Sequence, residues 1–93
     1  MKLSAEQREQ LRLSLLRFLD NNASSRGLSA ALLLQMARSE GRSDLDGSVV
    51  NVELQYLADK ELIAPANKTL SPEIFYWRIT AAGRDFMAMN NEQ

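Results

Sequence analysis

The feature that most constrains the fold is an apolar stripe near the middle of the chain. Val50, Leu54 and Leu57 recur at helical spacing, and at about 100° per residue their side chains cluster within roughly 60° of one another. The stripe is followed closely by residues 63–67, whose Pro65 confines them to the edge of a sheet. The sequence therefore predicts a helix that buries one face and then leads into an edge strand.

Two earlier helices are placed by the residues at their ends. Ser4, with Gln7 three residues later, has the pattern of a capping box and begins the first helix. Ser29 is a suitable N-cap for the second helix, and Gly41 suits its left-handed C-terminal end. Three helices are therefore expected before the first predicted strand.

The third helix begins at Ser43 or Asp46, and both residues are good N-caps. Residues 74–79 are aromatic and β-branched, so they predict the second strand of a hairpin with an open loop. Thr80 then caps a short last helix that holds Phe86 and Met89, and residues 91–93 are expected to fray.

The first helix carries more leucine than one buried stripe needs. Its core-facing residues are predicted to be Leu11, Leu15, Phe18 and Leu19. Leu13 and Leu16 fall well off that stripe, so we expect them to pack on the last helix or on a second subunit. A small domain gains stability by association, and we expect a homodimer formed through the first and last helices.

Two segments resemble a known family. Residues 54–63, LQYLADKELI, resemble the L-x-x-L-x-x-x-G-L-[IV] signature with which MarR-, PadR- and ArsR-type repressors leave their recognition helix. Residues 76–83, YWRITAAG, are similar to the second wing strand of those repressors, where it enters the next helix. Glu61 stands where the family usually has glycine, because the helix ends there in a left-handed turn. The chain also resembles the small winged-helix proteins of Mu-like prophages.

The resemblance implies a single domain over residues 1–93 in the α+β class, mostly α. The expected fold is a winged helix-turn-helix with a three-helix core, a two-stranded β-hairpin wing and a short C-terminal helix. It also implies a dimeric, cytoplasmic regulator of transcription that binds double-stranded DNA. These functions are expected only from the resemblance, because a fold does not by itself imply a function.

Composition argues against several other classes. The chain has no cysteine and no histidine, so it has no disulfide, no thiolate or imidazole metal site and no cysteine nucleophile. Asp44 and Asp46 lie beside a helix start, where acids are expected for capping and dipole reasons. We therefore expect no catalytic residues, no metal and no cofactor. The longest apolar run, residues 28–36, is too short to span a bilayer, and the polar first residues do not resemble a signal peptide.

For DNA, the third helix would present side chains that read base edges. Asparagine and glutamine bond adenine through two hydrogen bonds, and serine bonds several bases. A basic residue on each side would contact phosphates. The candidate residues are Arg42, Ser48, Asn51, Gln55 and Lys68. The same polar residues also occur on any solvated helix face.

The charge distribution weighs against strong DNA binding. Residues 1–42 hold seven basic residues against four acids, a balance of +3. Residues 43–61 hold one lysine against five acids, a balance of −4. Because phosphate neutralisation supplies most non-specific affinity, binding through this acidic segment should be weak.

The alternative is a protein-interaction module that uses the same helix. Val49, Val52 and Tyr56 form an apolar patch beside the acidic Glu53, and such a patch is typical of a protein interface. Val49 and Tyr56 can instead widen the buried stripe. The interface candidates are Val49, Val52, Glu53, Tyr56, Leu13 and Leu16. On the first helix, Arg8, Arg12 and Arg17 are either a complementary surface for that interface or a solvated face, with Glu9 able to pair with Arg12.

Overall fold

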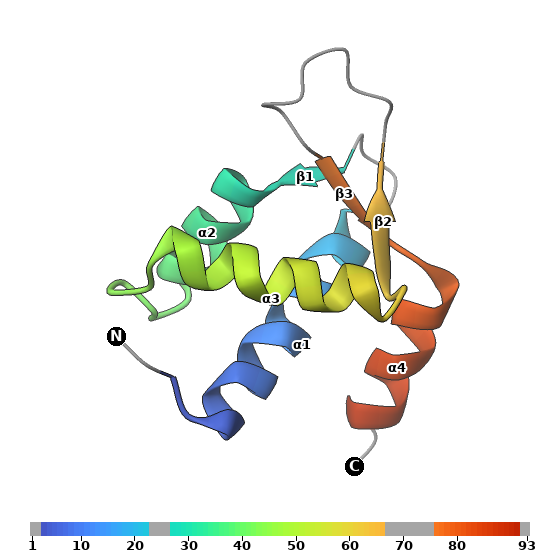
Figure 1. The fold of residues 1–93 in the computed structure, drawn as a ribbon, viewed down its shortest axis with the longest axis horizontal. Coiled ribbons are helices and arrows are strands. Elements are labelled where there is room, and N and C mark those ends of the chain that lie inside the picture. Colours follow the sequence, from blue (N-terminus) through green and yellow to red (C-terminus); the bar gives the residue numbers. More distant parts are fainter. Residues whose placement is uncertain (1–2, 23–26, 67–75, 92–93) are drawn as a thin grey trace.

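The computed structural model describes residues 3–22, 27–66 and 76–91. It is mostly helical, with a small antiparallel sheet, and belongs to the α+β class (Figure 1). The elements in chain order are α1 (Ala5–Asn21), β1 (Leu28–Ser29), α2 (Ala30–Ser39), α3 (Gly47–Asp59), β2 (Ile63–Pro65), β3 (Tyr76–Ile79) and α4 (Ala81–Asn91). None of the helices in the described part of the chain is long and apolar enough to cross a membrane.

The helix starts follow the capping chemistry that the sequence indicates. The capping box of α1 is confirmed: the Ser4 N–H donates to Gln7 Oε1 at 2.9 Å, and the Gln7 N–H donates to Ser4 Oγ at 3.1 Å. For α3 the N-cap is Asp46 rather than Ser43, with the Ser48 N–H donating to Asp46 Oδ1 at 3.2 Å. Each cap satisfies backbone donors that the first turn of a helix leaves without partners.

The sheet has one strand more than predicted. The expected two-stranded hairpin is a three-stranded sheet in the order β1-β3-β2, and Leu28 of β1 lies opposite Trp77 of β3. A strand of two residues is too short to show an alternation of apolar and polar side chains, so the sequence does not predict β1. The predicted N-cap of the following helix, Ser29, is confirmed. Gly27 permits the pairing, because it has a φ of 105° and a Cβ there would lie 2.6 Å from the Trp77 carbonyl oxygen.

The core lies between the first three helices and the sheet. Val50, Leu54 and Leu57 are at most 1% exposed, which confirms the predicted inward face of α3. Leu16 was expected to pack on the last helix or on a second subunit. It is fully buried in the core of the chain, so it is not available to a second subunit, whereas Leu13 is half-buried. The reason is the central place of α1, which contacts α2, α3, α4 and β3 and therefore buries more than one stripe (Figure 1).

The exit of α3 is held to the start of α4 by hydrogen bonds. Glu61 has a φ of 63°, the left-handed conformation expected at that position. The Thr80 hydroxyl donates to the Glu61 carbonyl at 2.8 Å and accepts from the Gly83 N–H at 3.0 Å, so Thr80 caps α4 as predicted. Gly83 lies so close to the Leu62 carbonyl oxygen that a Cβ would be 2.2 Å from it. A glycine is therefore required where α4 crosses the end of α3.

Candidate functional site

The outer face of α3 is the surface that the sequence singled out. Ser48, Asn51 and Gln55 are exposed, as expected, on the side of the helix opposite its buried stripe. The Gln55 Nε2 donates to Asp59 Oδ1 at 3.0 Å, one turn later on the same face. Figure 1 shows α3 lying across the front of the molecule.

Glu53 does not belong to that surface, which corrects the expectation that it contributes to an acidic interface. Its side chain is 2% exposed, and it accepts from Arg8 Nε at 3.1 Å and from Arg12 Nε at 2.5 Å. Two guanidinium groups are needed there because a carboxylate is buried at a cost of several kcal/mol unless it is paired and hydrogen-bonded. The sequence does not reveal the contact, since the partners lie 41 and 45 residues apart.

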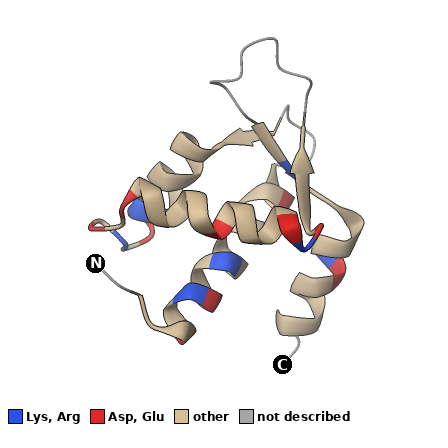
Figure 2. Cartoon of the chain, viewed as in Figure 1, with Lys and Arg blue, Asp and Glu red and all other residues tan. Residues whose placement is uncertain are grey.

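The inward turn of Glu53 changes the charge of the candidate surface. It is the only acid in residues 47–58, so the middle of the outer face carries no carboxylate. The remaining acids flank the helix: Asp44 and Asp46 precede it, and Asp59 and Glu61 mark its end (Figure 2). The negative balance of this segment is therefore concentrated at the two ends of α3.

The arginines of α1 bind within the chain rather than forming a free basic face. Arg12 pairs with Glu53 instead of Glu9, and its guanidinium lies 3.8 Å from the centre of the Tyr56 ring. Arg17 Nη2 donates to Glu40 Oε1 at 2.7 Å. These pairs join α1 to α3 and to the end of α2, so their main role is to stabilise the packing of the helices.

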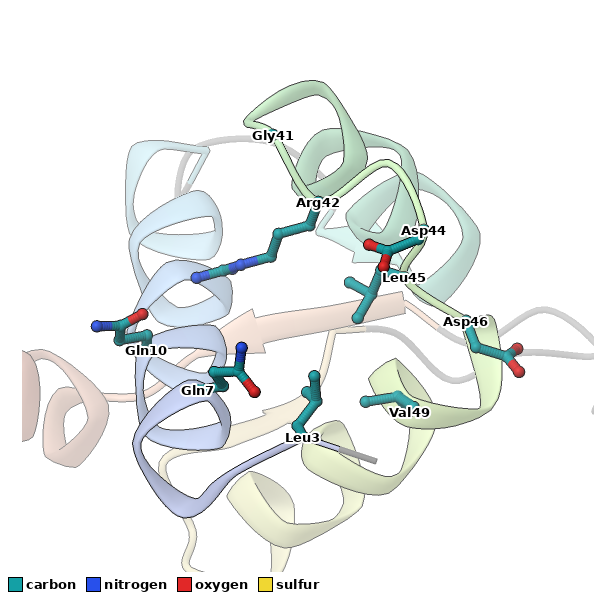
Figure 3. A pocket seen from close by; sticks show the side chains of 9 residues that line it. All are labelled: Leu3, Gln7, Gln10, Gly41, Arg42, Asp44, Leu45, Asp46 and Val49. Atoms are coloured by element: carbon teal, nitrogen blue, oxygen red, sulfur yellow. The ribbon is translucent and has the colours of Figure 1, made fainter. Parts of the chain in front are cut away.

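Arg42, the predicted phosphate contact before α3, is half-buried. Its side chain reaches from the loop before α3 toward α1 (Figure 3), and its Nη1 is buried with no hydrogen-bond partner among the described residues. The backbone of Arg42 bonds Ala37 and Leu45, which fixes where the side chain begins. Lys68, the other predicted phosphate contact, lies outside the described residues.

The predicted apolar patch is smaller than expected. Val49 is half-buried and packs against the core, so it widens the buried stripe. Val52 and Tyr56 remain on the surface, at 58% and 38% exposure. Tyr56 also lines a groove of about 360 Å³ between α1, α3 and α4, which Leu13 and Phe86 line as well. Two apolar surfaces therefore border on Tyr56, one on the outer face of α3 and one beside α4.

In the ranges that the structure describes, no group of three or more acidic side chains is gathered as a metal site would require. What α3 offers instead is a rigid, solvent-facing row of amide and hydroxyl groups with an apolar border, which is suited to non-covalent recognition. No family model matches the chain, and no match is found among curated proteins or solved structures.

Proposed function

We propose that this chain is a winged helix-turn-helix protein that binds double-stranded DNA through α3 and regulates transcription. The observation that carries the proposal is the uncharged middle of the outer face of α3, which presents Ser48, Asn51 and Gln55 while the only acid in residues 47–58 is turned inward. In this interpretation, α2 and α3 are the helix-turn-helix pair, and β2 and β3 are the base of the wing.

The side chains on this face suit recognition of base edges. Asn51 and Gln55 are one turn apart, and each amide has a donor and an acceptor, as adenine requires in the major groove. To donate to a base, Gln55 would give up or share its bond to Asp59. Because the opposite face of α3 is buried at Val50, Leu54 and Leu57, the helix is fixed in rotation and holds these amides outward. Each specific amide–base pair would contribute roughly 1–3 kcal/mol of discrimination.

The affinity for the DNA backbone should be low. Arg8 of α1 pairs with Glu53 of α3, and its side chain is still 47% exposed, so it is the basic residue of α1 that we expect to contact a phosphate. Tight binders neutralise about 6–10 phosphates, and each contact contributes roughly −0.9 to the slope of log affinity against log salt. A protein with few such contacts should therefore show a shallow salt slope and depend on base contacts.

Fluorescence anisotropy with labelled random duplexes tests the proposal. At about 50 mM salt we expect measurable binding, and selection of sequences from the pool should enrich adenine at fixed positions. The double variant Asn51→Ala/Gln55→Ala should lose that preference. Gln10→Ala/Asn21→Ala, which removes two exposed amides from α1, should retain it. Absence of binding at this salt concentration contradicts the proposal.

A second candidate function is favoured by the exposure of Val52. An apolar side chain in the middle of a solvent-facing helix, with acids at both helix ends, also suits a partner protein with a basic rim. Pull-down from the native host followed by mass spectrometry would identify such a partner. Val52→Ser/Asp59→Asn should then lose the partner but keep any affinity for DNA. Unchanged capture would count against the protein-binding function alone.

A further inference from the structure

A cavity of about 230 Å³ lies between the start of α1 and the loop that joins α2 to α3 (Figure 3). Its apolar lining includes Leu3, Leu45 and Val49, and its polar lining includes Gln7 and Arg42. The volume is somewhat below the range of about 300–1,000 Å³ that is typical of ligand pockets. It therefore suits a small ligand with both an apolar and a polar part.

Arg42 supplies the first reason to expect a ligand in this cavity. Its Nη1 is buried and has no hydrogen-bond acceptor in the described part of the chain. A guanidinium carries five N–H donors and no acceptor, and a buried donor without a partner is costly. Such a group in a native structure calls for an explanation, and an acceptor that draws the guanidinium toward the adjoining cavity provides one.

Gln7, an exposed residue of the capping box, supplies a second donor at the cavity. Its Oε1 accepts from the Ser4 N–H at 2.9 Å, which determines which end of the amide is engaged. The Nε2 donors are left without a bond to any described residue, and Figure 3 shows the amide on the cavity side of α1. The cavity is thus faced by donors from two separate elements, α1 and the loop before α3.

We propose that this cavity binds a small monocarboxylate with a short apolar body. Its carboxylate accepts from the guanidinium of Arg42 and from Gln7 Nε2, because an ionised carboxylate offers only acceptors and forms strong charge-assisted hydrogen bonds with arginine. The apolar body contacts Leu3 and Val49.

The acids near the cavity narrow the ligand class. Asp44 directs its carboxylate toward the cavity, whereas Asp46 points away and caps α3 (Figure 3). The negative charge at Asp44 disfavours every anion, but it disfavours inorganic phosphate, with its higher charge, more strongly than a monocarboxylate, and it favours an ammonium group on the ligand. The site therefore accommodates a carboxylic acid or an apolar α-amino acid, with the carboxylate as the shared requirement.

Nitrogen-15 NMR titration of the full chain tests the proposal with four probes: 4-methylpentanoate, leucine, 3-methylbutylamine and inorganic phosphate. We expect 4-methylpentanoate, leucine or both to shift the side-chain signals of Arg42 and Gln7 in a saturable manner. Shifts caused only by the amine or only by phosphate overturn the proposal. Absence of saturable shifts with every probe also overturns it.

Two variants separate a binding role from a structural one. Gln7→Glu preserves the capping box, since glutamate serves there as well as glutamine, but it replaces the donor with an anion. Arg42→Met keeps an unbranched apolar stem and removes the donors. Each should weaken carboxylate binding by about tenfold or more. The charge-matched control Gln35→Glu, on an exposed position of α2, should bind as the wild type does.

Stability gives an independent readout. If Arg42 is held unpaired for a ligand, Arg42→Met should unfold at the same urea concentration as the wild type or a higher one, because a costly buried donor is removed. A lower midpoint together with unchanged carboxylate binding would show that Arg42 is structural and would overturn the proposal. The DNA-binding measurements use other residues, so either proposal can fail without the other.

Discussion

Arg12 and Glu53, 41 residues apart in the chain, form an ion pair with 2.5 Å between Arg12 Nε and Glu53 Oε1. The carboxylate is almost completely buried, and Arg8 contacts its other oxygen. The pair joins the first half of α1 to the middle of α3 and removes a negative charge from the surface that we propose for recognition. The same contact therefore supports the packing of α3 and the character of its outer face.

Substitution of Glu53 should destabilise the protein. Glu53→Gln leaves two guanidinium groups without their anion, and we expect the free energy of unfolding to fall by about 1–3 kcal/mol. Urea denaturation measures the change. Glu9→Gln, at an exposed position on the same helix as the arginines, is the control and should change stability by less than about 0.5 kcal/mol. Equal midpoints for both variants would show that the buried pair contributes no net stability.

The leucines of α1 should differ strongly in their contribution to stability. Leu16→Ala removes a fully buried side chain and should lower the free energy of unfolding by about 2–5 kcal/mol. Leu13→Ala, at a half-buried position facing the groove beside α4, should cost less than half as much. Thermal or urea unfolding of the two variants checks this, and a larger loss for Leu13→Ala would contradict the placement of Leu16 in the core.

The left-handed exit of α3 offers a stabilising substitution. Glu61→Gly should raise the free energy of unfolding by up to about 1 kcal/mol, because glycine adopts a φ of 63° without the steric cost of a side chain. The neighbouring Lys60 has an ordinary φ of −84°, so Lys60→Gly should lower stability instead. If both glycine variants shift the urea midpoint in the same direction, the conformation at Glu61 is not the cause.

Self-association should use the groove between α1 and α4. We still expect a homodimer through these helices, now with Leu13, Phe86 and Met89 as its apolar contacts, since Leu16 is not available. Phe86→Glu should dissociate it by placing a charge in the interface. Sedimentation equilibrium measures the mass, and a wild-type mass near 10.5 kDa at micromolar concentration would refute the dimer.

The sequence alone determined where three of the helices begin and which face of α3 is buried. Capping at Ser4, Ser29 and Thr80 and the spacing of Val50, Leu54 and Leu57 depend on residues within one or two helical turns, so the pattern along the chain is enough to predict them.

Only the tertiary structure decided the rest. The burial of Leu16, the pairing of Leu28 with Trp77, the inward turn of Glu53 and the direction of Arg42 all depend on which elements meet in space. A leucine or an arginine has the same local pattern on a solvated face and in a contact, and the free energy that separates the two comes from partners distant in the sequence. For this chain, those distant partners also decided which charges remain on the outer face of α3.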